Sequence, residues 1–338
     1  MQRIHVQRHL VLVFIFTFFI VNARSQELTY AEKLGFPKGA KVLILHVDDV
    51  GMSWDSNQGA FQAMEKGVAN SLSVMMPCPW VPAFVHYLKD HPQTDAGLHL
   101  TLTSEWKDYR WAPLAGRPTV PGLVDPEGAL WRSVDQVAKN ASPDEVETEI
   151  REQLKRARDM GFEPTHLDSH MGTLFATPQF LERYIKVGIE SKIPVMFPGG
   201  HNTMIGKERN VTPEMKDQFK ATGKMIWDAG LPVLDDLHNV SYDFEYPEKD
   251  LSDNALQKIA TSRYIETIRE LKPGVSMVIM HCTAPGDTFK FVANSGRVRK
   301  ADMLAMMDPA FKKFLQDEKI ILTTWRELKQ RREKAGNR

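Results

Sequence analysis

Two adjacent carboxylates, Asp48 and Asp49, come directly after a largely apolar run at residues 43–47 and are followed closely by Gly51. A run of this kind predicts a buried strand, and α/β proteins build their sites at the carboxyl ends of such strands. Neighbouring aspartates that face one cavity repel each other, so a metal ion or a shared proton is needed to hold them there. The alternative is that one of them only caps the helix that follows.

Acids and histidines also stand at the ends of other predicted strands. They are His99, His166, Asp168, His170, His201, Asp235, Asp236, His238 and His281. Each alone could be a capping group or a buried core histidine. The carboxyl ends of parallel strands meet at one rim, however, so the sequence predicts that several of these side chains converge. One carboxylate with two imidazoles is a ligand set for a divalent ion that leaves positions open for water and substrate.

The elements that must position these groups alternate along the chain. Short apolar runs predict strands at 41–47, 71–76, 95–101, 164–168, 193–197, 231–235, 274–281 and 319–323, and amphipathic segments predict helices at 55–66, 80–90, 143–160, 177–190, 212–228, 253–271, 300–316 and 324–334. Ser142, Thr177 and Thr212 each precede a proline and predict helix starts. This alternation predicts an α/β fold, a TIM-barrel-like (β/α) barrel with parallel strands, distorted or regular. An open doubly wound sheet is the alternative.

The N-terminal residues have the layout of a secretory signal peptide. Basic residues precede the apolar run 10–21, and the small residues Ala23 and Ser25 precede Gln26. We therefore expect residues 1–25 to be removed and the protein to be exported to the periplasm or the medium; an uncleaved anchor is the alternative. The remainder, 26–338, is predicted to be a single barrel domain with an insertion at about 102–141.

Composition excludes several classes of partner. The 338 residues are 42% hydrophobic and 25% charged with a formal net charge of zero, which indicates neither a nucleic-acid partner nor a stable membrane partner. Cys78 and Cys282 are the only cysteines, so the chain is no disulfide scaffold, although the two could pair in an oxidising compartment. The sequence does not indicate an oligomeric state.

Three short motifs resemble a known family. His46-Val-Asp-Asp-Val-Gly51, Gly97-Leu-His-Leu100 and His166-Leu-Asp-Ser-His170 resemble the motifs of the YdjC-like carbohydrate deacetylases, which include the chitooligosaccharide deacetylases. The resemblance runs from about residue 40 to the C-terminus. It implies a (β/α)-barrel-like fold and the removal of acetyl groups from N-acetylated sugars with the help of a divalent metal ion.

The resemblance also implies roles for individual residues. Carried across by position, it implies Asp49, His99 and His170 as metal ligands and Asp48 as the catalytic base. Similarity to the wider polysaccharide deacetylases implies His281 as the general acid. One carboxylate with two imidazoles suits Zn²⁺ best, while Mg²⁺ or another divalent ion would also fit an open site.

Other residues are expected to support this centre. Asp168 is interpreted as orienting a ligand histidine, and His46 as a buried structural histidine. Trp106, Arg110 and Trp111, in the insertion, are candidates for contact with a sugar ring; the alternative is that the insertion folds onto a small core of its own. The third motif departs from that of many relatives, which continue with Gln-His after the final histidine, and this departure puts substrate choice in doubt.

The predicted function is thus metal-dependent removal of acetyl groups from a chitooligosaccharide-like or other acetylated glycan. Two rivals remain. Another metallohydrolase, acting on an ester or a phosphate, would use similar ligands and is expected to offer an arginine or a glycine-rich anion site at the rim. A sugar-binding protein without activity would need neither the base Asp48 nor the acid His281.

Overall fold

The computed structural model describes residues 27–239, 241–246 and 251–336. Its strands are β1 (Lys41–Val50), β2 (Ser71–Val74), β3 (Ala96–Leu100), β4 (Leu167–Ser169), β5 (Asp236–His238), β6 (Gly274–Met280) and β7 (Ile321–Leu322). They pair in parallel in the order β4-β3-β2-β1-β6-β5, with β7 beside β1. The parallel sheet confirms the predicted fold class.

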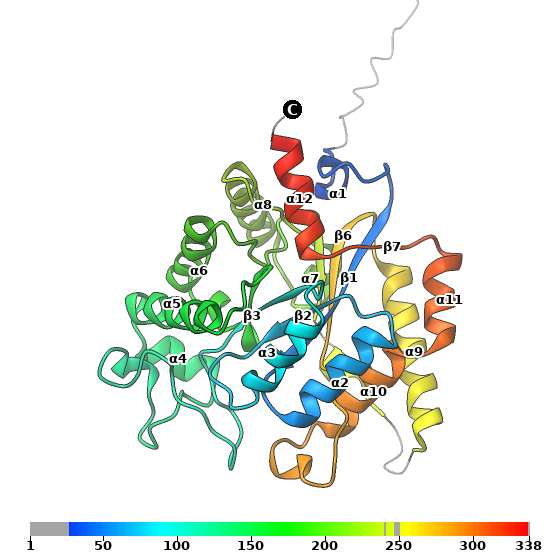
Figure 1. Ribbon diagram of the computed structural model, residues 1–338. Coiled ribbons are helices and arrows are strands. Elements are labelled where there is room, and N and C mark those ends of the chain that lie inside the picture. Colours follow the sequence, from blue (N-terminus) through cyan, green and yellow to red (C-terminus); the bar gives the residue numbers. More distant parts are fainter. Residues whose placement is uncertain (1–26, 240, 247–250, 337–338) are drawn as a thin grey trace, which may run out of the picture.

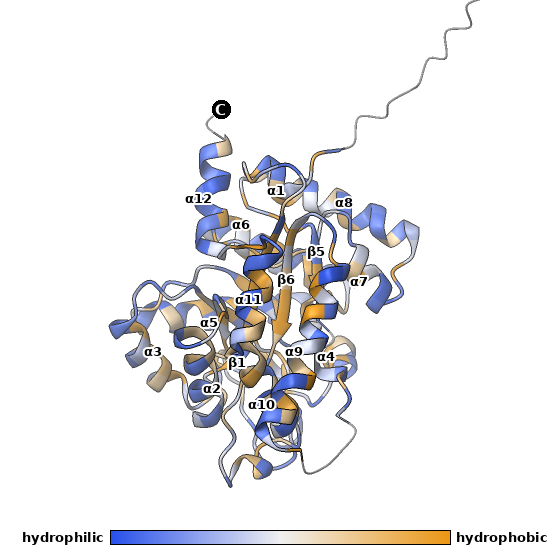
Figure 2. Cartoon of the chain, turned by 90° about the vertical axis from the view of Figure 1, so that its right-hand side faces the viewer, coloured by the Kyte–Doolittle hydropathy of each residue, from blue (hydrophilic) through white to orange (hydrophobic). Residues whose placement is uncertain are grey.

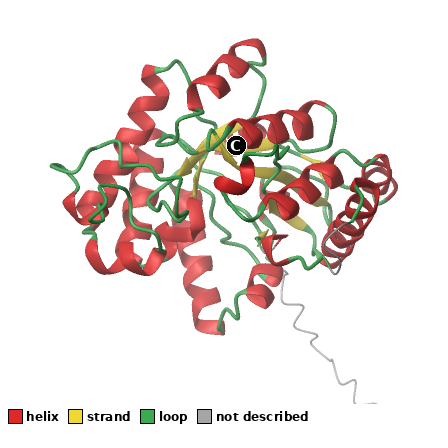
Figure 3. Cartoon of the chain, turned by 90° about the horizontal axis from the view of Figure 1, so that it is seen from below, coloured by secondary structure: helices red, strands yellow, loops and turns green. Residues whose placement is uncertain are grey.

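The sheet curls toward closure between its outer strands β4 and β5. A parallel bridge joins Leu167 of β4 to Val195, and a second joins Pro198 to Leu234, just before β5. The result is a distorted (β/α) barrel, with the strands in the middle and the helices around them in Figure 3. The strands predicted at 193–197 and 231–235 are reduced to these single bridges.

The last predicted strand, at 319–323, does not take the position of the eighth strand of a regular barrel. Ile321 of β7 pairs with Val42, near the start of β1, whereas β2 pairs farther along with His46 opposite Ser71. Since β6 occupies the other side of β1 from Lys41 to Val47, β7 and β2 share one flank of β1. With only two residues, β7 is a short support for the amino end of β1.

The helices surround the sheet. They are α1 (Tyr30–Lys33), α2 (Trp54–Glu65), α3 (Val81–Asp90), α4 (Val134–Asn140), α5 (Pro143–Asp159), α6 (Pro178–Ser191), α7 (Thr203–Glu208), α8 (Pro213–Asp228), α9 (Asp253–Glu270), α10 (Gly296–Met306), α11 (Pro309–Asp317) and α12 (Trp325–Gly336), with 3₁₀ turns η1 (Pro121–Leu123), η2 (His170–Phe175), η3 (Ser241–Asp243) and η4 (Phe289–Phe291). Ser142, Thr177 and Thr212 cap α5, α6 and α8 as predicted. The helix predicted at 300–316 is divided, because Asp308 caps a new helix that has a proline at its first position.

Burial follows the pattern that the sequence indicates. β1 is buried from Val42 to Val50, and β6 is buried throughout. Figure 2 shows β6 in the hydrophobic colour, while the exposed faces of α8 and α12 are largely hydrophilic. On α5, Val146, Ile150 and Leu154 recur at a spacing of four and face the core.

The two ends of the barrel are built differently. At the upper end in Figure 1, α1 and α12 lie side by side, and the guanidinium of Arg331 packs 3.9 Å from the ring centroid of Phe36. At the lower end lie the insertion and the loop after β6. The insertion is tied to α5 by the buried carboxylate of Glu149, which accepts hydrogen bonds from the backbone N–H groups of Leu114 (3.0 Å) and Ala115 (2.9 Å).

The predicted export has to be corrected. It depended wholly on residues 1–25, the proposed signal peptide, and these lie outside the described residues. Within the part of the chain that the structure describes, no helix is long and apolar enough to cross a membrane. Nothing in the described chain supports secretion, and the assignment to the periplasm or the medium is not retained.

Candidate active site

Both carboxylates at the end of β1 turn toward the same place. Asp49 has a φ of 64°, in the left-handed region, and the pairing of β1 with β2 shifts register between Val47 and Val50. In a regular strand successive side chains point to opposite faces, so this irregularity lets neighbouring aspartates share one cavity. Asp48 Oδ2 lies 3.8 Å and Asp49 Oδ1 3.3 Å from Nε2 of His99.

Neither aspartate caps the following helix. The N-cap of α2 is Ser53, whose hydroxyl accepts the backbone N–H of Ser56 at 3.0 Å. The capping alternative is therefore excluded for both Asp48 and Asp49, which are almost fully buried with no helix end to satisfy.

Asp49, His99 and His170 bring three potential ligand atoms together. Asp49 Oδ1 is 3.3 Å from His99 Nε2 and 3.3 Å from His170 Nδ1, and the two nitrogens are 3.2 Å apart. Ligand atoms held at about 2.0–2.2 Å from one ion stand roughly 3.0–3.5 Å from one another, so these spacings fit a single divalent ion. Asp49 Oδ1 is buried and has no hydrogen-bond donor among the described residues, as expected for an atom that awaits a cation.

The carboxylates of this cluster favour the protonated form of its histidines. Burial works to lower the pKa of His99, but Asp48 and Asp168 outweigh it and the pKa rises well above its usual value. Burial also works to lower the pKa of His170, but the carboxylates of Glu105 and Asp49 outweigh it and raise this pKa to about 9. A metal ion bound there would displace any proton that these imidazoles hold toward it.

Asp168 and His46 support the cluster of Asp49, His99 and His170 from the strand side. Asp168 Oδ1 accepts a hydrogen bond from His99 Nδ1 at 2.6 Å, and its Oδ2 lies 2.9 Å from His46 Nε2. That same nitrogen is 3.1 Å from Asp48 Oδ1, so His46 bridges the two carboxylates. Asp168 therefore contacts His99, one of the two histidines that the family resemblance implies as ligands, and His46 is buried between the two carboxylates.

Replacing Asp168 with asparagine is expected to weaken metal binding by about 10- to 100-fold, because the charged acceptor that orients the His99 ring is lost. Competition with a metal-chelating dye measures the affinity. Asp144→Asn, at the exposed start of α5, is the matched control and is expected to change nothing. An unchanged affinity for Asp168→Asn would show that His99 needs no such support.

His166 belongs to the core rather than to the cavity. Its ring stacks on Trp325 with centroids 5.3 Å apart, and its Nε2 is 3.6 Å from Asp168 Oδ2. The ring fits because position 97 is glycine: a Cβ on Gly97 would come within 2.5 Å of the imidazole.

Two partners of the cluster were not predicted. Glu105 Oε2 is 3.1 Å from Nε2 of His170, on the side of the ring away from the cluster. Arg299, on α10, is 2% exposed and places Nη2 2.7 Å from Asp49 Oδ2. Burial opposes ionisation of Asp49, but Arg299 and the histidines hold its pKa well below the usual value. Neither residue has a local sequence signal, because Glu105 lies in the irregular segment after β3 and Arg299 reaches the site from the distant α10.

His281 follows β6 and lies beside this cluster. Its ring packs edge-on against Tyr242 with centroids 4.5 Å apart, and its backbone N–H donates to Asp302 Oδ2 at 2.9 Å. Burial lowers the pKa of His281 to about 4, and nearby Asp49 only partly opposes this shift. The imidazole is therefore neutral near pH 7, and no group in the described part of the chain forms a hydrogen bond with its Nδ1.

The chain that carries this cluster of acids and histidines also matches a known protein family. The YdjC-like protein family matches residues 42–317. The chain belongs to this family. The match confirms the resemblance drawn from the three sequence motifs, and it covers β2 to β6, all of β1 except its first residue, and the residues of the cluster.

Curated relatives of this YdjC-like protein include deacetylases from several bacteria. A carbohydrate deacetylase of Thermus thermophilus is 27% identical over 300 residues, which cover 88% of this chain and 97% of the relative. One from Brevibacillus brevis is 35% identical over 46% of this chain and 59% of its own length. The chitooligosaccharide deacetylase of Citrobacter koseri is 32% identical over 38% of this chain and about half of its own length, 49%.

A solved structure supports the fold. A protein of Enterococcus faecalis V583, provisionally assigned to cellobiose-phosphate cleavage, superposes with a TM-score of 0.67 over 86% of this chain and 99% of its own. At 19% identity the similarity concerns the architecture alone. It agrees with a distorted barrel for this YdjC-like protein.

The predicted sugar contacts in the insertion need correction. Arg110 is held inside it by Asp125 (2.6 Å) and Glu127 (2.8 Å), and Trp111 is buried and donates its Nε1–H to the carbonyl of Thr103. These two side chains stabilise the insertion itself, which is the alternative that the sequence left open. Trp106 is only partly buried and lies 5.8 Å from the Arg299 guanidinium, so it remains a candidate for substrate contact.

Asp235 and Asp236, two of the acids predicted at strand ends, cap helices instead of joining the cluster. Asp235 accepts the backbone N–H groups of Tyr30 (2.8 Å) and Ala31 (3.0 Å) at the start of α1. Asp236 accepts those of Met204 (2.8 Å) and Ile205 (3.2 Å) at the start of α7. Asp236 is also approached by His201, while His238 pairs with Glu208. In this YdjC-like protein, the group therefore holds helices in place.

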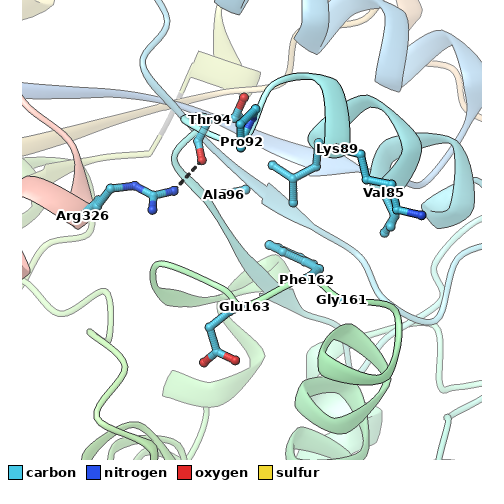
Figure 4. Close-up of a pocket in the computed structure, with 10 residues that line it drawn as sticks. Val85, Lys89, Pro92, Thr94, Ala96, Gly161, Phe162, Glu163 and Arg326 are labelled. Carbon is cyan, nitrogen blue, oxygen red and sulfur yellow. Dashed lines mark hydrogen bonds between the residues drawn. The ribbon is translucent and has the colours of Figure 1, made fainter.

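The two cysteines form no disulfide bond, and a hollow on another part of the barrel lies apart from the acid–histidine cluster. Cys78 and Cys282 are both buried and free, so they do not pair. A hollow of about 260 Å³, shown in Figure 4, is lined by residues before β3 and by Gly161–Glu163 after α5, and Arg326 donates to the carbonyl of Thr94 at its edge. It lies at the amino end of β3, away from the cluster at the carboxyl ends.

Proposed function

We propose that the protein is a metal-dependent carbohydrate deacetylase that hydrolyses the N-acetyl group of an acetylated oligosaccharide, releasing acetate and a free amine. The observation that carries this proposal is the convergence of Asp49, His99 and His170 at the carboxyl rim of a barrel that belongs to the YdjC-like family. The curated relatives named as carbohydrate and chitooligosaccharide deacetylases support the choice of substrate.

Asp49, His99 and His170 would hold the ion. When bound, a divalent ion there would polarise the acetyl carbonyl and make water a stronger acid. One carboxylate with two imidazoles favours Zn²⁺, while Mg²⁺ or another divalent ion remains an alternative that metal analysis decides. His99 is fixed for this task by Asp168, and His170 by Glu105.

Asp48 is proposed as the base. Its Oδ1 is held by His46 Nε2 at 3.1 Å and by the hydroxyl of Ser73 at 3.3 Å. Its Oδ2 accepts no hydrogen bond from the described residues and lies 3.8 Å from His99 Nε2, and the residue keeps 7% of its surface exposed, against 1% for Asp49. A carboxylate anchored by one oxygen can take a proton from water with the other.

His281 is proposed to assist departure of the amine. Since the imidazole is neutral near pH 7, it does not hold the required proton in advance. The proton that reaches the amine is therefore one that water loses during attack: Asp48 takes it, and it passes to the nitrogen directly or by way of His281. The C–N bond breaks as the amine gains this proton, and the hydroxyl oxygen stays on the acetate.

The rival metallohydrolase reading is less well supported. A phosphate substrate calls for a free arginine at the rim, but Arg299 is committed to Asp49 Oδ2 and to the hydroxyl of Tyr242, which its Nε contacts at 2.7 Å. A binding protein without activity, in turn, would not need a carboxylate placed as Asp48 is.

Chelation is expected to stop turnover. Purified protein should release acetate from N-acetylated oligosaccharides, lose at least about 100-fold in rate with chelator, and recover when a divalent ion is restored, because the ion supplies the main electrostatic stabilisation. Acetate is measured by a coupled assay, with O-acetylated sugars in parallel. Release that persists after complete metal removal would overturn the proposal.

A further inference from the structure

Two tryptophans stand exposed next to each other at the carboxyl rim. Trp54 is 47% exposed and Trp80 is 41% exposed, and their rings lie 5.4 Å apart at an angle of 52°. Large aromatic side chains gathered in solvent mark surfaces that bind something, since leaving indole faces in water forgoes the stabilisation that burial gives.

The backbone ties this pair to the loop that carries the catalytic carboxylates. The N–H of Trp80 donates to the carbonyl of Gly51 at 3.0 Å. The side chain of Asn57 accepts the N–H of Gly51 at 2.7 Å and donates to the carbonyl of Trp80 at 3.0 Å. Gly51 is two residues beyond Asp49, a span of at most about 7 Å.

The neighbouring loop completes the same stretch of rim. Trp54 is the first residue of α2, directly after the N-cap. The next residue, Asp55, accepts the N–H of Gly286 at 3.0 Å through its side chain and that of Ala284 at 3.0 Å through its carbonyl. The segment that follows His281 is thereby joined to the tryptophan pair, which lies on the same rim as Asp48 and His281.

We infer that Trp54 and Trp80 form a stacking surface for a sugar unit of the substrate chain other than the unit that loses its acetyl group. This inference rests on the proposed function. The apolar face of a pyranose packs on an aromatic ring, and indoles present large rigid faces at a low cost in side-chain entropy. An N-acetylated glycan of several units can place one unit on the pair and another at the carboxylates, whereas a single sugar has one unit for the two places. The surface would therefore select for chain length.

The test compares chain lengths. For Trp54→Ala, Trp80→Ala and the double variant, kcat and KM are measured with N-acetylglucosamine and with its β-linked tetramer. The ratio of kcat/KM for the tetramer to that for the monosaccharide should fall about tenfold in the double variant, chiefly through KM. Met225→Ala, on α8 and 46% exposed, is the matched control and should leave the ratio unchanged. An unchanged ratio in the double variant overturns the inference.

A binding measurement distinguishes failure of this inference from failure of the proposed function. Calorimetric titration of the tetramer into metal-loaded wild type and double variant needs no turnover. Tetramer binding that weakens about tenfold in the variant supports the surface, even if the wild type releases no acetate and the proposed function fails. Equal affinities for the two proteins reject the surface, even if both release acetate.

Discussion

Replacing Asp48 with asparagine is expected to reduce acetate release by about 10²- to 10⁴-fold, because the amide cannot take a proton from water. The fold should persist, since asparagine keeps the shape of the side chain and can still contact His46 and Ser73. Metal binding should also persist, because the ligand atoms belong to Asp49, His99 and His170. The measurements are kcat with the tetramer and metal content by atomic emission.

The neighbouring aspartate provides the control. Asp49→Asn makes the same chemical change one residue away, but it removes the carboxylate oxygen that lies 3.3 Å from both imidazoles. We expect this variant to lose metal and activity together, whereas Asp48→Asn loses activity alone. If Asp48→Asn turned over at the wild-type rate with metal bound, Asp48 would have no part in proton transfer.

Much of the site was predictable because strand ends are visible in sequence. The apolar run before Asp48, and the short runs before His99 and His170, indicate where parallel strands stop. A parallel sheet then brings those ends to one rim, although the residues are far apart in the chain. The family motifs added the proposed roles of Asp49, His99 and His170 as metal ligands, which spacing alone does not provide.

The prediction failed where long-range contacts decide the outcome. Arg110 and Trp111 were candidates for sugar contact because the insertion is rich in aromatic residues, yet Asp125 and Glu127 hold the arginine within the insertion, the alternative that the sequence left open. The left-handed backbone of Asp49, which brings the two carboxylates to one cavity, has no signal in a β-branched run. Export rested on composition at the N-terminus alone.

Arg299 was also missed in the sequence, and its ion pair with Asp49 leads to a specific prediction. It is a single arginine on a helix, with no motif to mark it, and in the fold it neutralises the buried carboxylate of Asp49. Its Nε also donates to Tyr242 Oη (2.7 Å) and Ser295 Oγ (2.9 Å), which fix the guanidinium. Removing one partner of a buried ion pair costs about 3–5 kcal/mol, since the other charge is left uncompensated.

A bound divalent ion would supply that compensation. Arg299→Met is therefore expected to lower the Tm strongly in the presence of chelator and much less with saturating metal, so that metal stabilises the variant more than the wild type. Thermal unfolding of both proteins, with and without metal, measures the difference. Arg110→Met breaks ion pairs with Asp125 and Glu127, neither of which is a proposed ligand, and should lower the Tm equally in both conditions. Equal losses for Arg299→Met would mean that the arginine contributes packing alone and does not balance the charge of Asp49.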